Sequence, residues 1–122
     1  MTAALNTAAA GFADEHSPYL SVARVQQQLG VTASELARLI GVARNTLAAK
    51  SRARKVDQAL SPLVRILAMA AEMSGDESRA AIWFKHQPIP GWAGKTAYDL
   101  MAEGKSDKVL AYLEAVRSGV YA

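Results

Sequence analysis

The sequence contains no cysteine, which excludes both a disulfide framework and a thiolate site for a metal or a nucleophile. No apolar run approaches the roughly 20 residues that a membrane-spanning helix needs. The first residues have no basic region ahead of their apolar side chains, so they do not form a secretory signal. These absences predict a soluble, cytoplasmic protein without a membrane partner.

Side chains suited to catalysis are also scarce. The two histidines, His16 and His86, have no carboxylate pair at the spacing of a metal site or a catalytic triad. The run Gly94-Lys95-Thr96 resembles the end of a phosphate-binding loop, but the first glycine of that motif would fall at Ile89, and no strand precedes it. We therefore expect no catalytic residue, no metal and no cofactor, and a binding protein rather than an enzyme.

The apolar residues recur at helical spacing from Ser21 onward, and no alternating run is long enough for a strand. The sequence thus predicts an all-α fold with an N-terminal helix-turn-helix half and a small C-terminal helical half. We expect three parts in chain order, a flexible leader over residues 1–18, a helix-turn-helix domain over 19–75 and a C-terminal domain over 76–122.

Several local patterns predict where helices begin. Thr32 and Glu35 have the spacing of a capping box, and Thr96 has a similar pattern with Asp99. Ser61-Pro62 predicts the start of a long apolar helix that reaches Met73 and joins the two halves. Ser106 predicts the cap of the last helix, which ends at Gly119.

A helix-turn-helix is predicted around Gly41. Ala37 is small where a second helix must cross closely, and Gly41 permits a positive φ. This spacing resembles that of the Xre/Cro repressors, so the segment from Ala43 to about Lys50 is predicted to be the recognition helix. Its side chains, with the basic residues that follow, suit base and phosphate contacts. The predicted DNA-binding residues are Arg44, Asn45, Thr46, Lys50, Arg52, Arg54 and Lys55.

The positive charge is concentrated in the same region. Residues 36–71 contain seven lysines and arginines against Asp57 alone, whereas the net charge of the whole chain is only +3. A helix-turn-helix can also be a packing unit that never touches DNA, but a localised basic field favours a nucleic-acid partner.

The last third of the chain has the features of a partner-binding surface. Residues 87–91 include two prolines and a glycine, and they form an elbow that cannot be helix interior. Trp92 on this elbow is the better candidate for an exposed anchor, whereas Trp83 is predicted to fill the core. The apolar stripe of the last helix fits either the core or a dimer interface.

This region resembles the Xre/MbcA/ParS toxin-binding domain of antitoxins. The resemblance rests on Trp83, Pro88, Gly94-Lys95-Thr96, Leu100, Gly104, Val109, Leu113 and the terminal Gly119-Val120-Tyr121-Ala122. The chain departs from the family at Ala97, where proline is usual, and at Trp92, where a smaller aliphatic residue is usual. Neither departure removes the helix cap or the elbow.

The resemblance implies an antitoxin of a type II toxin–antitoxin pair. Its partner would be a RES-domain toxin that consumes NAD or transfers ADP-ribose, and the C-terminal region would occlude the NAD pocket. The implied toxin-binding residues are Trp92, Lys95, Thr96, Gly119, Val120, Tyr121 and Ala122. Such antitoxins also repress their own operon, and a helix-turn-helix that reads paired half-sites predicts a homodimer.

One alternative remains open at the level of sequence. The chain would be a stand-alone repressor of the Xre type if its C-terminal half served dimerisation or effector binding, with no toxin partner. The helix-turn-helix alone does not separate these two readings.

Overall fold

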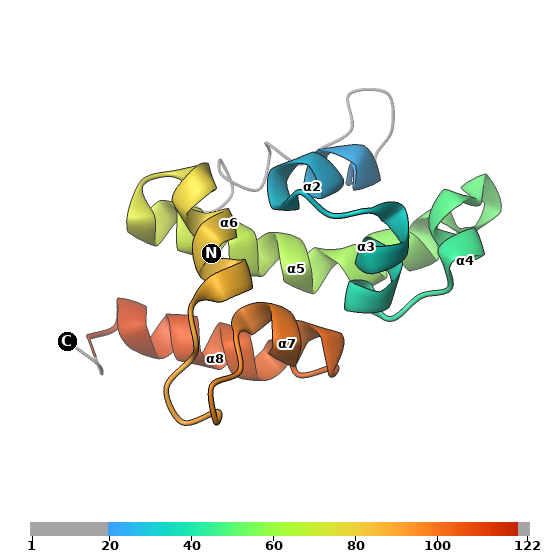
Figure 1. The fold of residues 1–122 in the computed structure, drawn as a ribbon. Helices are drawn as coiled ribbons and strands as arrows, with labels where there is room; N and C mark the ends of the chain where they lie inside the picture. The colour runs from blue at the N-terminus through green and yellow to red at the C-terminus, as the bar shows by residue number, and fades with distance from the viewer. Residues whose placement is uncertain (1–19, 120–122) are drawn as a thin grey trace.

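The computed structural model describes residues 20–119, which form seven α-helices and one short 3-10 helix, η1 (Figure 1). No strand forms within this range, and Pro88 and Thr96 form an isolated β-bridge. The predicted all-α fold is confirmed. The elements are α2 (Val22–Leu29), α3 (Ala33–Ile40), α4 (Arg44–Ala48), η1 (Lys50–Arg52), α5 (Ala53–Ser74), α6 (Glu77–His86), α7 (Ala97–Ala102) and α8 (Ser106–Arg117).

Two of the four predicted helix-capping signals, at Thr32 and Thr96, act as expected. The Thr32 side chain accepts a hydrogen bond from the Glu35 backbone N–H at 3.1 Å, and the Glu35 carboxylate accepts one from the Thr32 N–H at 2.9 Å. These bonds lower the pKa of Glu35, because they favour its charged form. Thr96 and Asp99 form the same reciprocal pair at the start of α7. Two of the four orphan N–H groups are thereby satisfied at each of these helix starts.

The long helix α5 does not begin where the sequence predicted. It runs from Ala53 to Ser74 with Pro62 inside it, so Ser61 is not its cap. Proline removes one intrahelical hydrogen bond and crowds the preceding turn. Val56 and Leu60, which precede Pro62, are nevertheless buried in the same core as Leu63. Burial of this shared apolar face keeps the segment in one helix, since packing contributes more to helix stability than local propensity does.

Two other helix boundaries also differ from the prediction. The helix after the turn, α4, ends at Ala48, because Ala49 has extended backbone angles, and Lys50 belongs to η1 instead. Ser106 is the first residue of α8 rather than its cap, and Lys105 precedes the helix without a side-chain capping bond. The rest of α8 follows the predicted stripe, with Val109 and Leu113 buried.

One core joins the two halves of the chain. In Figure 1, α5 runs through the middle of the molecule, with α2 above it and α7 and α8 below it. Leu60, Leu63, Ile66 and Leu67 of α5 are almost fully buried, and they share a cluster with residues of every other α-helix, including Phe84 of α6. No charged or polar residue of the range 20–119 is buried. The predicted role of α5 as the joining helix is therefore seen directly.

None of the helices described is long and apolar enough to cross a lipid bilayer. The predicted leader over residues 1–18 lies outside the described residues, as do Val120, Tyr121 and Ala122.

The continuity of α5 predicts that Pro62→Ala stabilises the protein. Alanine restores a helix hydrogen bond and relieves crowding, which together exceed the entropy that proline removes from the unfolded chain, so the free energy of unfolding should rise by about 2 kcal/mol. Urea denaturation followed by circular dichroism measures this change. Ser61→Ala is the matched control, and it should change stability by less than about 0.5 kcal/mol. A loss of about 1 kcal/mol in Ser61→Ala would instead identify Ser61 as a helix cap.

Candidate functional site

The helix-turn-helix has the packing that the sequence predicted. Gly41 adopts a left-handed φ of 78°, and the N–H of Val42 donates to the carbonyl of Ala37 at 2.9 Å, which closes the turn. Leu36 and Leu47 are buried between the two helices, with Ala37 also buried where they approach. Ala43 precedes α4 and makes no side-chain capping bond, as expected for alanine.

The predicted DNA-binding side chains lie on three successive elements. Arg44, Asn45 and Thr46 are in α4, Lys50 and Arg52 are in η1, and Arg54 and Lys55 are in the first turn of α5. All of them are exposed except Thr46, which is half-buried. The five basic side chains form no ion pair with any residue in the range 20–119. Their charge is therefore not neutralised within the described part of the protein and is available to an anionic partner.

The elbow after α6 is a closed loop rather than an open linker. The N–H of Ile89 donates to the carbonyl of Lys95 at 2.8 Å, and the N–H of Lys95 donates to the carbonyl of Trp92 at 3.0 Å. Ile89 is buried and anchors the loop to the core. Ala93 has a positive φ of 53°, between two glycines that are also left-handed. A non-glycine residue in this conformation costs roughly 1 kcal/mol or more, so the surrounding bonds must hold it there.

The predicted toxin-binding residues of the elbow are engaged with neighbouring side chains. Lys95 and Lys105 both donate to the same carboxylate oxygen of Glu103, at 2.8 and 3.2 Å. These two hydrogen bonds lower the pKa of Glu103. The Nζ of Lys105 also lies 5.6 Å from the centroid of the Trp92 ring, at cation–π distance. Trp92 is half-buried, and Thr96 is the cap of α7. Both residues therefore contribute to the conformation of the loop.

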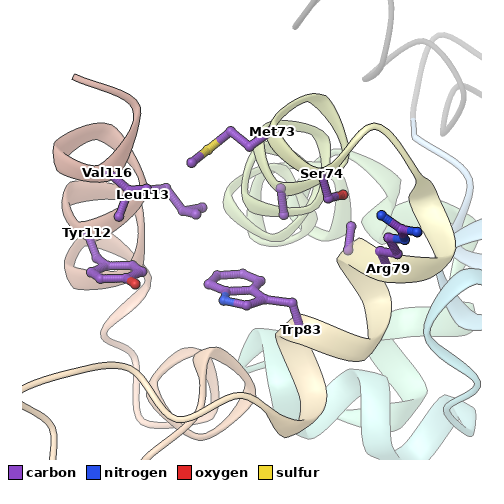
Figure 2. Close-up of a pocket in the computed structure, with 9 residues that line it drawn as sticks. Met73, Ser74, Arg79, Trp83, Tyr112, Leu113 and Val116 are labelled. Carbon is purple, nitrogen blue, oxygen red and sulfur yellow. The ribbon is translucent and has the colours of Figure 1, made fainter. Parts of the chain in front are cut away.

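A second surface was missed by sequence reasoning. Trp83 is half-buried rather than core, and it lines a hollow of about 310 Å³ between α5, α6 and α8. Figure 2 shows its indole directed toward Tyr112 and Leu113 of α8, with Met73 of α5 above the gap. A second hollow of about 260 Å³ shares Trp83 and Arg79 and extends along α6 past Ile82 to His86. No local signal in the sequence marks this surface, because adjacent apolar residues such as Ile66 and Leu67 of α5 are both buried in the core.

The opposite face of α6 connects to the helix-turn-helix. The ammonium group of Lys85 donates to the carbonyl of Leu29 at 3.0 Å, at the C-terminal end of α2. The side-chain amide of Gln28 donates to the carbonyl of Glu77 at 2.8 Å, at the start of α6. A lysine at a helix C-terminus satisfies an orphan carbonyl and interacts favourably with the helix dipole. These bonds hold α6 against α2.

Comparison with family models gives two matches that follow each other along the chain. Residues 8–64 match the antitoxin Xre-like helix-turn-helix domain. Residues 69–119 match the antitoxin Xre/MbcA/ParS C-terminal toxin-binding domain. The chain belongs to the Xre/MbcA/ParS antitoxins. Comparisons with curated proteins and with solved structures gave no significant match.

The family assignment confirms the predicted resemblance and favours an antitoxin over a stand-alone repressor. Both matched families are binding domains and not typical enzyme families. The two matches are separated by residues 65–68, inside α5, whereas the sequence prediction placed the domain boundary at Gly75. All the residues that line the two hollows of the antitoxin fall within the toxin-binding match.

Proposed function

We propose that this antitoxin neutralises a cognate RES-domain toxin and represses its own operon. The observation that carries the proposal is the pairing of a toxin-binding domain with an exposed basic helix-turn-helix in one chain. The C-terminal region occludes the NAD pocket of the toxin, which consumes NAD or transfers its ADP-ribosyl group. The elbow residues Trp92, Lys95 and Thr96 and the chain end contribute the toxin contacts.

The chain end is the part proposed to reach the NAD pocket. Gly119 has a left-handed φ of 88°, which is incompatible with a continuation of helix α8. Tyr121 combines a large apolar face with a hydroxyl and little rotamer entropy, as a binding anchor requires.

The basic helix-turn-helix is proposed to bind operator DNA. Arg44 and Asn45, at the start of α4, suit guanine and adenine edges in the major groove. Arg52, Arg54 and Lys55 suit phosphate contacts, which position the protein without reading sequence. All of these side chains are exposed, and the basic ones form no ion pair with residues 20–119, which supports contact with an anionic partner.

The DNA proposal predicts different effects for the two groups of residues. Arg44→Ala or Asn45→Ala should cost about 1–3 kcal/mol of binding free energy at the operator and relax sequence preference. Arg52→Ala or Arg54→Ala should weaken binding to any duplex and flatten its salt dependence. Gel-shift titrations at two salt concentrations, with DNA from upstream of the antitoxin gene, measure both effects. Lys108→Ala on α8 is the matched control, and unchanged affinity in an Arg44/Lys50/Arg52 triple alanine variant would exclude DNA binding by this face.

The tail proposal predicts a loss of neutralisation without a loss of folding. Deletion of residues 119–122, or Tyr121→Ala, should weaken toxin binding by about 2 kcal/mol, the typical cost of losing a buried aromatic anchor. The melting temperature of the antitoxin alone and its operator affinity should remain close to those of the wild type. The measurement is NAD consumption by the toxin encoded beside the antitoxin. If the truncated protein still silences the toxin fully, neutralisation resides in Trp92 and the elbow.

A homodimer is proposed because helix-turn-helix proteins read paired half-sites. The apolar surfaces predicted to form its interface, on the 62–73 helix and the 109–116 stripe, are largely buried within one chain. A dimer interface would therefore have to include residues outside these surfaces. Sedimentation equilibrium should show a dimer, and a stable 13.0 kDa monomer at tens of micromolar, above ordinary dimer dissociation constants, would contradict the proposal.

A further inference from the structure

The two hollows around Trp83 form one apolar groove that neither the fold nor the proposed sites account for. Its walls come from the end of α5, the outer face of α6 and the last turns of α8. In Figure 2 the side chains of Met73, Trp83, Tyr112 and Val116 surround the first hollow. We call this surface the Trp83 groove, and its lining residues are Ala70, Met73, Ser74, Arg79, Ala80, Ile82, Trp83, His86, Gln87, Tyr112, Leu113 and Val116.

The exposed apolar side chains of the described chain gather at this groove. Ile82 is 62% exposed and Met73 is 38% exposed, and within residues 20–119 they are the two large hydrophobic residues that remain exposed. Scattered apolar residues on a surface are ordinary, but a hollowed patch lined by tryptophan, tyrosine and isoleucine is typical of an interaction site. Large aromatic residues in such a patch provide the contacts that contribute most to binding energy.

Two observations identify the occupant as the toxin. All the lining residues lie within the match to the toxin-binding domain. The last turn of α8 lines the groove through Val116, and Tyr121, which is proposed to contact the toxin, follows Gly119 by two residues. Two extended residues span at most about 7 Å, so a toxin contacted by Tyr121 must lie close to this end of α8. A protein that sits there reaches the groove as well.

The charge at the edge of the groove defines the chemistry of the contact. Arg79, in the first turn of α6, has a side chain that is 75% exposed, and its ion pair with Asp76 is long, at 4.0 Å. An exposed pair of this length is worth little, so the guanidinium remains available to a better acceptor. A carboxylate offers the bidentate geometry that arginine binds most strongly.

We propose that the Trp83 groove is a second toxin-docking surface, separate from the elbow and the chain end. It takes an apolar anchor side chain on the toxin surface, between Trp83, Tyr112 and Met73. A carboxylate beside that anchor pairs with Arg79. This inference rests on the proposed binding of a toxin, and it assigns to the groove a share of the affinity that does not depend on access to the NAD pocket.

The test uses the full-length antitoxin and, as probe, the purified toxin encoded by the adjacent reading frame. Ile82→Asp places a charge in the groove at a position exposed enough to leave the fold intact. It should weaken toxin binding at least 30-fold by calorimetry, and Arg79→Glu should weaken it about tenfold. Ala111→Asp, at an exposed position of α8 outside the groove, is the matched control and should bind like the wild type. Each variant should keep the wild-type melting temperature.

The outcomes separate the groove from the proposed function. If the wild type binds the toxin and both groove variants bind equally well, the groove proposal is wrong while the antitoxin function stands. If the wild type does not bind the toxin, the proposed function fails and the groove proposal fails with it.

Two other occupants have their own signatures, and either would overturn the proposal. A second copy of the chain is the occupant if Ile82→Asp converts a dimer to a monomer in sedimentation while toxin affinity is unchanged. The chain's own end is the occupant if deletion of residues 120–122 alters the Trp83 emission of the free protein. This last measurement uses a Trp92→Phe background, in which Trp83 is the only tryptophan of the antitoxin.

Discussion

Burial of α5 on two sides is the constraint on which the rest of the structure depends. Leu60, Leu63 and Leu67 lie in a core that receives side chains from the helix-turn-helix and from the toxin-binding domain alike. This shared burial keeps the helix continuous through Pro62. The 22 residues of α5 extend for about 33 Å, so the helix acts as a rigid connection between the two surfaces.

The two binding surfaces lie toward opposite ends of this helix. The basic residues Arg54 and Lys55 are in its first turn, whereas Met73 in its last turn lines the Trp83 groove. At 1.5 Å per residue, Lys55 and Met73 are roughly 27 Å apart along the axis. That separation leaves room for a toxin at one end and DNA at the other, and it makes the substitutions at each surface separable in experiment.

Helix α6 connects the Trp83 groove to the helix-turn-helix half of the chain. Its outer side chains, Ile82 and Trp83, form the groove wall. Its inner side chains hold the other elements, since Phe84 packs edge-on against Tyr98 with ring centroids 5.9 Å apart and Lys85 bonds to the end of α2. A groove variant therefore needs an operator-binding control, because α6 also packs against α2 of the helix-turn-helix half.

Local chemistry was sufficient to predict much of the fold. The capping boxes at Thr32 and Thr96 and the left-handed glycines at Gly30 and Gly41 act within one or two turns, so their signals are complete in a short stretch of sequence. The family resemblance and the basic segment could also be predicted, because each rests on residue types at fixed spacing within one stretch of the chain. The early end of α4 could not be predicted, since alanine at position 49 is not a residue type that ends a helix.

The remaining features depend on contacts between residues far apart in the chain. Ser61-Pro62 is a good local start for a helix, but tertiary burial of Val56 and Leu60 extended α5 backward past it. Trp83 is compatible with a core by composition, and only the placement of α8 across from α6 decided that its indole lines a groove. Sequence alone thus determined that the fold is helical, the capping boxes at Thr32 and Thr96, and the family. The tertiary structure decided which side chains stayed exposed, because burial depends on which helices pack together and not on a residue's own neighbours.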